Sequence, residues 1–369
     1  MSILVNYSMS RNLIYTCVFS NENYVKLTIE LIKSFLNSNP EENGCDFLVY
    51  TNQSYRDLIL AEITDTRIKF HINNYYNTMN QSRISKIDIF DYKELHNYEK
   101  ILYLDTDSLI TGDVNQLFSE FQNEKTETMF VLKEGNVLAE NELWGRTLFI
   151  KNAKTEDRPG IQACVFGFIN RDSGNIKKMF LKIKQQFFLD MYQGKLLFYD
   201  QPYLNYNFYE SGLCKLDTET LGKYCNGGAR TYNSQYIIHH FSGCPGNYSI
   251  KSELINDFKI KSELVNDFKN KIQNVQTVTP MSNNKSISIS TYITDMVEWF
   301  IDKYVENANN MKCEQNTLTV KDYLTLFTKT LQDGHTKFKE TLETQEKKRK
   351  EFEDMLNACV EKAMKTKNV

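Results

Sequence analysis

The chain has 369 residues, of which 41% are hydrophobic and 13% aromatic, and its formal net charge at pH 7 is −3. This length exceeds one average domain, so we expect one large domain with an appendage. The near balance of charge gives no electrostatic basis for nucleic acid or an anionic membrane as the main partner, and no apolar stretch approaches the roughly 18 residues that span a membrane.

Segments with the patterns of strands and helices alternate from residue 13 to about residue 169, which favours an α/β layered fold with parallel strands. The predicted strands cover residues 13–19, 47–50, 68–72, 101–104, 129–132 and 164–169. The helices predicted between them cover residues 24–36 and 86–95. A third helix is predicted over 175–192, a fourth begins at Asp200 with Pro202 in its first turn, and a last strand covers 237–241.

The character of the chain changes after residue 249. Residues 250–259 (IKSELINDFK) are repeated almost unchanged as residues 260–269 (IKSELVNDFK), a duplication too short for a solenoid and typical of an insertion or a helical spacer. A polar stretch near 277–288 predicts a linker, and three later segments have apolar residues at helical spacing. The predicted organisation is a domain over 1–249, a spacer over 250–288 and a helical extension over 289–369.

The eight cysteines are scattered and form no CxxC pair. Several lie inside apolar runs, where a free cysteine acts as a small buried hydrophobe. Reduced thiols of an intracellular protein fit this distribution better than a disulfide framework or a zinc site. The N-terminus also lacks the basic-then-apolar pattern of a signal peptide. We therefore expect a soluble protein of the cytoplasm.

Two aspartates, Asp105 and Asp107, follow the apolar run 101–104. A chain that leaves a buried parallel strand emerges at its carboxyl end, where open α/β sheets bind their ligands. Two carboxylates one residue apart can turn toward one divalent cation, because hard cations prefer oxygen ligands. Asp-x-Asp also occurs by chance in chains of this length, so its surroundings decide its meaning.

Three further elements belong with this pair. Lys86 lies upstream of it, where a lysine could neutralise a phosphate, although a surface lysine is the commoner case. Asp200 and Gln201 open a predicted helix, and a simple helix cap is the alternative for them. His239 and His240 end an apolar strand, where a structural histidine is the alternative. A neutral imidazole that joins two carboxylates suits Mn²⁺ better than Mg²⁺.

In this order the elements resemble glycosyltransferase family 8, the glycogenin-like retaining enzymes with a GT-A fold, over about residues 11–250. The resemblance implies a mixed α/β sheet flanked by helices. It implies that Asp105, Asp107 and His240 hold the metal and that Asp200 and Gln201 lie beside the transferred sugar. The other residues that it assigns to the donor are Cys17, Val18, Phe19, Asn21, Tyr24, Lys86, Thr106, Gln162 and Gly243, with Tyr24 stacked on the base.

The chain also departs from the family pattern. The lysine that follows the histidine segment in the family would fall at Gly246, so one diphosphate contact is missing or is replaced by Lys251. The family motif Asn-Ala-Gly or Asn-Ser-Gly reads Gln-Ala-Cys at residues 162–164, which affects recognition of the sugar hydroxyls. An acidic residue often found before Asp-Gln is replaced by Leu197.

The resemblance implies Mn²⁺-dependent transfer of glucose from UDP-glucose to a glucan or a protein tyrosine, with retention at the anomeric carbon. Self-transfer stays open, because Tyr224, Tyr232 and Tyr236 lie in the region that carries the acceptor tyrosine of glycogenins. A homodimer stays open as well. The alternatives are the same fold with another UDP-sugar and a separate acceptor, a nucleotidyltransferase, and a non-catalytic interaction protein that binds sugar nucleotides.

Overall fold

The computed structural model describes residues 11–40, 44–121, 127–154, 156–171, 174–197, 199–215, 220–230, 232–242, 250–260 and 262. All of them belong to the first of the two units into which the chain divides, Met1–Ser286. Gly243, Gly246, most of the second copy of the repeat, the predicted linker and the predicted helical extension lie outside the described residues.

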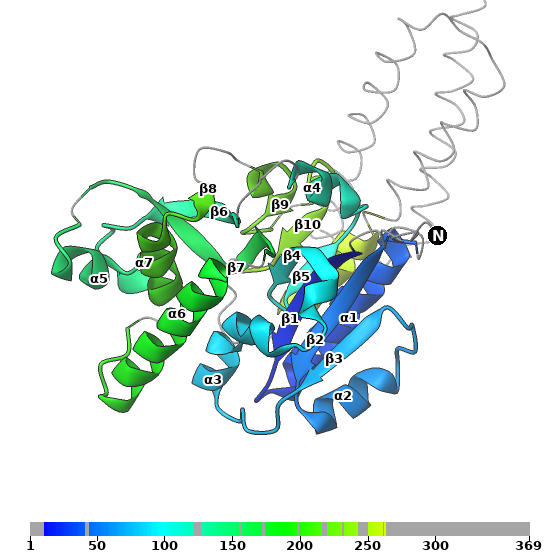
Figure 1. The fold of residues 1–369 in the computed structure, drawn as a ribbon. Coiled ribbons are helices and arrows are strands. Elements are labelled where there is room, and N and C mark those ends of the chain that lie inside the picture. The colour runs from blue at the N-terminus through cyan, green and yellow to red at the C-terminus, as the bar shows by residue number, and fades with distance from the viewer. Residues whose placement is uncertain are drawn as a thin grey trace, which may run out of the picture. The chain divides into compact units, whose positions relative to one another are not determined.

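A mixed sheet of seven strands forms the centre of the described region (Figure 1), in the order β3-β2-β1-β4-β7-β6-β8. Its strands are β1 (Arg11–Val18), β2 (Cys45–Thr51), β3 (Ile68–Ile72), β4 (Tyr98–Leu104), β6 (Met129–Asn136), β7 (Pro159–Ile169) and β8 (Cys214–Lys215). The mixed α/β fold class expected from the resemblance is confirmed.

Strand direction departs in part from the parallel pattern. The strands β3, β2, β1 and β4 are parallel neighbours, whereas β7 is antiparallel to both β4 and β6. All residues of β7 after its first are buried. A strand buried on both faces gives the same continuous apolar run whether its neighbours are parallel or antiparallel, so the sequence pattern alone cannot distinguish them.

Helices cover both faces of the sheet. They are α1 (Glu22–Ser38), α2 (Gln53–Leu60), α3 (Met79–Ile84), α4 (Asn115–Glu120), α5 (Arg146–Lys151), α6 (Asn175–Tyr192) and α7 (Gln201–Ser211). Figure 1 shows α1 and α2 on one side of the sheet and α6 and α7 on the other. In β1, Tyr15 and Cys17 join the core under α6 and α7, while Ile14 and Val18 join the core under α1, as alternation along a strand requires.

The prediction of one continuous α-helix over residues 86–95 is wrong. The segment forms the 3₁₀ helices η2 (Ser85–Asp91) and η3 (Leu95–Asn97) instead. Every residue from Ser85 to Ile89 is buried. Residues 85–89 therefore have no solvent face of the kind that an amphipathic α-helix presents.

A small second sheet lies beyond the end of β4. It consists of β5 (Ser108–Ile110), β10 (Ile238–His240) and β9 (Cys225–Asn226), in the order β5-β10-β9. The strand β10 is antiparallel to β5, and His240 pairs with Ser108. Because Ser108 directly follows Asp107, this register brings His240 next to the aspartate pair.

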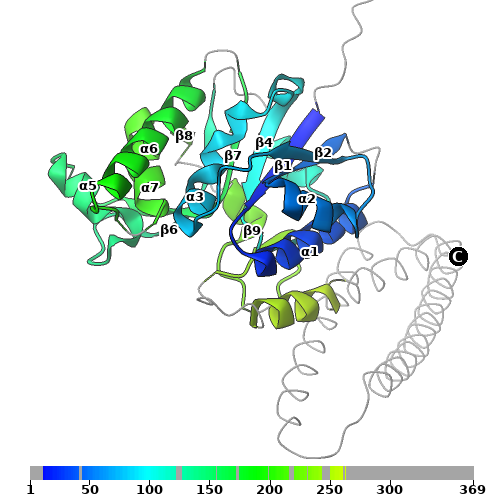
Figure 2. The ribbon, with the colours of Figure 1, turned by 90° about the horizontal axis from the view of Figure 1, so that it is seen from below.

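The first copy of the repeat is helical over residues 250–260. In Figure 2 this helix, yellow-green by the colour bar, lies beside α1, and Ile255 and Phe258 pack against Leu27 of α1. The five cysteines among the described residues are free thiols. None of the described helices combines the length and the apolar character needed to cross a membrane.

Candidate metal and nucleotide site

The aspartate pair leaves the carboxyl end of β4, whose residues Ile101 to Leu104 are buried. The backbone N–H of Asp105 donates to the carbonyl of Cys164 over 2.9 Å, and the carbonyl of Asp107 accepts from Phe241 over 2.9 Å. These two bonds tie the Asp-x-Asp turn to β7 and to the residue after β10. The turn is therefore held by both sheets.

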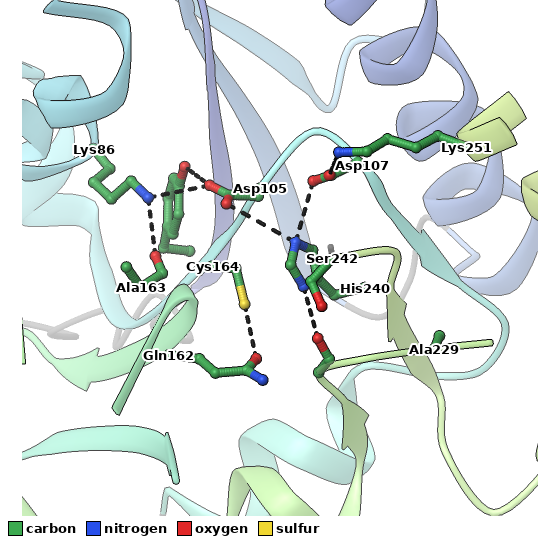
Figure 3. Close-up of polar contacts among 12 residues, drawn as sticks. Lys86, Asp105, Asp107, Gln162, Ala163, Cys164, Ala229, His240, Ser242 and Lys251 are labelled. Atoms are coloured by element: carbon green, nitrogen blue, oxygen red, sulfur yellow. Dashed lines mark hydrogen bonds and ion pairs between the residues drawn. The ribbon is translucent and has the colours of Figure 1, made fainter. Parts of the chain in front are cut away.

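His240 faces the two carboxylates (Figure 3). Its Nε2 lies 3.3 Å from Asp107 Oδ1 and 4.0 Å from Asp105 Oδ2. Its Nδ1 lies 2.9 Å from the carbonyl oxygen of Gly227, which accepts the Nδ1 proton and leaves Nε2 turned to the acids. Ligand atoms of the three residues all lie within 4.8 Å of one another.

His239 points the other way, as alternation along β10 requires. Its side chain is fully buried, and its ring centroid lies 5.1 Å from that of Phe258. Its Nε2 lies 3.2 Å from Thr111 Oγ1. Of the two neighbouring histidines, only His240 reaches the aspartate pair among the described contacts.

Asp107 is buried between two cationic groups. Burial alone would raise the pKa of its carboxyl, but the neighbouring His240 and Lys251 hold that pKa well below its usual range. The Lys251 ammonium donates to Asp107 Oδ2. Burial alone would lower the pKa of Lys251, and Asp107 raises it above its usual value. Lys251 thus comes from the first copy of the repeat into the site.

The neighbours of His240 favour the protonated form of its imidazole. Burial alone would lower its pKa, but the neighbouring Cys164 and Asp107 raise that pKa well above the usual value. Burial raises the pKa of the Cys164 thiol, so the thiol is neutral at pH 7. The Asp107 carboxylate is therefore the group that holds the proton on His240.

Lys86 is buried on the opposite side of Asp105. Its ammonium lies 3.2 Å from Asp105 Oδ1, 3.0 Å from Asp200 Oδ2 and 3.0 Å from the carbonyl oxygen of Ala163. Burial alone would lower its pKa, but Asp105 and Asp200 raise that pKa well above its usual value. The ammonium donates hydrogen bonds to Asp105 and to Ala163, and its contact with Asp200 is an ion pair. Lys86 is buried, so the alternative of a surface lysine does not apply.

Asp200 and Gln201 lie at the start of α7. Asp200 makes no side-chain capping bond to the helix, which argues against the helix-cap alternative. Gln201 accepts from the backbone N–H of Ala163 over 3.1 Å and donates to the carbonyl of Leu143 over 3.3 Å. One turn further, the Asn205 carboxamide bonds the backbone of β7 at Ile161, as acceptor over 2.7 Å and as donor over 2.6 Å. These contacts fix the start of α7 against β7.

Gln162 joins β7 to the loop that carries the Gly227 carbonyl. The Cys164 thiol donates to Gln162 Oε1 over 2.9 Å. The amide packs onto the bare backbone of Gly227, where an added Cβ would lie 2.1 Å from Gln162 Oε1. The Gln-Ala-Cys segment thus lies next to the histidine end of the site.

The residues assigned to the base and ribose separate into two groups. Cys17, Val18 and Phe19 are buried core side chains, and Phe19 packs on an aromatic group with ring centroids 5.1 Å from Tyr50. Asn21 caps α1 by accepting from Asn23 over 2.9 Å. Tyr24 is partly buried, and its ring centroid lies 5.7 Å from Lys251 Nζ.

A pocket lies beside Asp105, Asp200 and His240. Eight of its lining residues were predicted from the sequence or belong to the Gln-Ala-Cys segment: Lys86, Asp105, Gln162, Ala163, Cys164, Asp200, Gln201 and His240. Four others were missed: Glu134, Leu143, Tyr199 and Ser242. Thr106 is buried and does not line this pocket. Glu134 and Leu143 lie in segments without a recognisable motif. Tyr199 and Ser242 lie beside motif residues, but their residue types indicate no particular role.

Neither protein-family models nor curated proteins match this sequence. Among solved structures, the chain is similar to the galactosyltransferase LgtC in complex with donor and acceptor sugar analogues, with 16% identity, 66% of this chain and 95% of that chain covered, and a TM-score of 0.43. It is also similar to the bifunctional glycosyltransferase WbbM, with 13% identity and a TM-score of 0.46, over 67% of this chain and 50% of that chain. For mouse xyloside xylosyltransferase 1 the identity is 15% and the TM-score 0.43, over 64% of this chain and 99% of that chain. Identities and TM-scores this low do not establish a function for this chain.

Proposed function

We propose that this protein is a metal-dependent retaining glycosyltransferase of GT-A type that takes its sugar from a UDP-sugar. The observation that supports this function is the convergence of Asp105, Asp107 and His240, whose ligand atoms lie within 4.8 Å of one another. These residues come from the ends of β4 and β10. The start of α7, with Asp200 and Gln201, lines the same pocket. In glycosyl transfer from a nucleoside diphosphate, Asp105 and Asp107 would hold the cation that binds the leaving diphosphate, and Asp200 would lie beside the transferred sugar.

The three residues fit a divalent cation. The carboxylates of Asp105 and Asp107 supply hard oxygen ligands, and the bond from Nδ1 to the Gly227 carbonyl directs Nε2 of His240 toward them, where it can bind a metal once it has lost its proton. This mixed set of nitrogen and oxygen ligands suits Mn²⁺. When bound, the cation supplies positive charge for the two phosphates of the departing nucleotide.

The two lysines have different roles in this proposal. Lys86 is buried and forms ion pairs with both Asp105 and Asp200, so it positions these two carboxylates relative to each other. Lys251 bonds Asp107 and lies near the ring of Tyr24. We therefore assign the diphosphate contact to Lys251, which takes the role of the lysine that the family motif would have at Gly246. Stacking of the base on Tyr24 fits the same side of the site.

The sugar would lie at the pocket formed by Asp200 and Gln201. A carboxylate beside the anomeric carbon stabilises the positive charge that develops there when the glycosidic bond breaks. Gln201 is held by Ala163 and Leu143, so its amide is fixed before the sugar binds. The resemblance to family 8 favours UDP-glucose as donor and a glucan or a protein tyrosine as acceptor, with self-transfer included.

The proposal is tested by replacing Asp107 with Asn. This change removes a charge with almost no change in volume, so we expect Mn²⁺-dependent UDP binding to be lost and sugar transfer to fall by about 10²–10³-fold or more. Calorimetric titration of UDP with and without Mn²⁺ measures the first effect. Glu62→Gln, the same chemical change at an exposed ion pair with Lys33, is the control. Unchanged Mn²⁺-dependent affinity in Asp107→Asn would refute the proposed metal site.

Product analysis separates this function from its rivals. Incubation of the wild-type protein with UDP-glucose and Mn²⁺ should release UDP, whereas a nucleotidyltransferase would release pyrophosphate. Binding without any release would identify a non-catalytic sugar-nucleotide-binding protein. Intact-mass spectrometry before and after the incubation detects self-transfer as an added hexose mass.

A further inference from the structure

The first copy of the repeat is seated on a defined surface of the molecule. Ile255 and Phe258 of this helix are almost fully buried against a group of apolar side chains, here named the docking surface: Leu27, Leu109, Ala229 and Phe241. The ring centroid of Phe258 lies 4.9 Å from that of Phe241 and 5.1 Å from that of His239. Ile255 and Phe258 are therefore the two buried anchors of the decapeptide, and Leu254 packs beside them partly buried.

Ion pairs fix both ends of the seated helix. Near its start Lys251 pairs with Asp107, and near its end Lys259 pairs with Glu30 over 2.6 Å. The two lysines are eight residues apart, which corresponds to about 12 Å along a helix axis. Two anions at this separation select a segment that carries two lysines at the same spacing, with apolar residues between them.

The second copy carries the same side chains at all but one of the contacting positions. Lys261, Phe268 and Lys269 repeat Lys251, Phe258 and Lys259 in the same order. The single difference between the copies is Val265 in place of Ile255. Removing this one methylene from a core contact weakens packing by about two- to twelvefold in an equilibrium constant.

We propose that the docking surface accepts either copy, so that residues 260–269 replace residues 250–259 in a minor state and Lys261 takes the place of Lys251 at Asp107. Seven residues, 243–249, connect Ser242 to the helix when the first copy is seated, and seventeen would connect it when the second is seated. This lengthening costs about a further fourfold in loop closure. The first copy is then favoured roughly ten- to fiftyfold, which leaves the second copy seated in a few per cent of molecules.

Hydrogen–deuterium exchange of the full chain, read by mass spectrometry over residues 250–269, tests this inference without any assay of sugar transfer. In the wild-type protein, protection should be concentrated in residues 250–259. In Phe258→Ala the first copy loses more than a hundredfold in packing, so protection should move by ten residues to 260–269. The double variant Phe258→Ala with Phe268→Ala should lose protection in both copies.

A second pair of substitutions tests the inference with smaller changes in volume, so that it does not depend on the alanine variants folding. Ile255→Val combined with Val265→Ile reverses the one difference between the copies and should raise protection of residues 260–269 at the expense of 250–259. Two outcomes overturn the inference. One is loss of protection from 250–259 in Phe258→Ala with no gain in 260–269. The other is a gain that grows with protein concentration, which would assign the second copy to a neighbouring molecule.

Discussion

His239 and His240 are neighbours in the sequence, yet their imidazoles differ in protonation. Burial lowers the pKa of His239 to about 4, so this ring is neutral in the apolar surroundings of Phe258. Burial alone would have the same effect on His240, but Asp107 raises the pKa of that imidazole well above its usual value. Alternation along β10 thus gives one histidine to the core and the other to the site.

The depressed pKa of His239 predicts a dependence of stability on pH. An unfolded histidine with a pKa near 6.5 takes up its proton at a higher pH than the folded one, so the free energy of unfolding should fall as the pH falls from about 6.5 to about 4. Between pH 7 and pH 5 we expect a loss of roughly 2 kcal/mol from this residue. Urea denaturation at both pH values checks it. The loss of unfolding free energy that His239 causes should be absent in His239→Gln. It should persist in His96→Gln, which removes an exposed histidine.

A second prediction separates the roles of the two histidines. His240→Ala should weaken Mn²⁺-dependent UDP binding and leave the melting temperature nearly unchanged, because the other contacts of Asp107 remain. His239→Ala should lower the melting temperature, because it leaves a cavity beside Phe258, and should affect UDP binding far less. Titration calorimetry and a melting curve on each variant give both quantities. The reverse assignment would follow if His239→Ala abolished UDP binding and His240→Ala did not.

At the scale of elements, the sequence was informative where hydrophobic periodicity is strong. The predicted helix over 175–192 and the predicted strand over 68–72 coincide with α6 and β3, because their apolar residues follow periods of 3.6 and 2. The start of β7 was predicted five residues too late. Its first residues, Pro159 and Gly160, have the composition of a loop, and their place in the strand depends on a tertiary contact with Trp144.

The site residues that could be identified from the sequence lie where a strand ends or a helix begins. Asp105, Asp107 and His240 could be identified in this way, because strand ends in an α/β sheet meet at one edge. Tyr199 could not. Its backbone has φ of 60°, a conformation rare for a side chain of this size, and no local residue pattern predicts it. The helical copy that brings Lys251 to Asp107 was also beyond prediction, because nothing in the repeat specifies where it packs.

The contact between Gly160 and Trp144 gives an element-scale prediction. A Cβ added at Gly160 would lie 1.8 Å from an atom of the Trp144 ring and 2.4 Å from the carbonyl oxygen of Glu134. Gly160→Ala should therefore lower the free energy of unfolding by about 1–3 kcal/mol or more. Gly228→Ala is the control, because its Cβ would meet only Ser242 Oγ at 3.8 Å. Equal denaturation midpoints for the two variants would contradict the proposed packing.

At the scale of the molecule, every described site residue lies at or before Lys251, and the docking surface is covered by Ile255 and Phe258. A chain that ends at about residue 275 should therefore keep both its melting temperature and its Mn²⁺-dependent UDP binding. A chain that ends at residue 249 should melt lower and aggregate, because it exposes the docking surface. A folded chain ending at 275 without UDP binding would mean that later residues complete the site.

The pairing of charges in the site has a consequence for ion uptake. Asp105, Asp107 and Asp200 face Lys86, Lys251 and the protonated His240, so three negative groups are already balanced by three positive ones. A divalent ion that binds here must remove the proton from His240 and loosen Lys251 from Asp107. Its uptake is then an exchange of cations rather than an addition of charge to empty carboxylates. The apparent affinity for the ion should accordingly rise with pH and change less with ionic strength than it would for two unpaired aspartates.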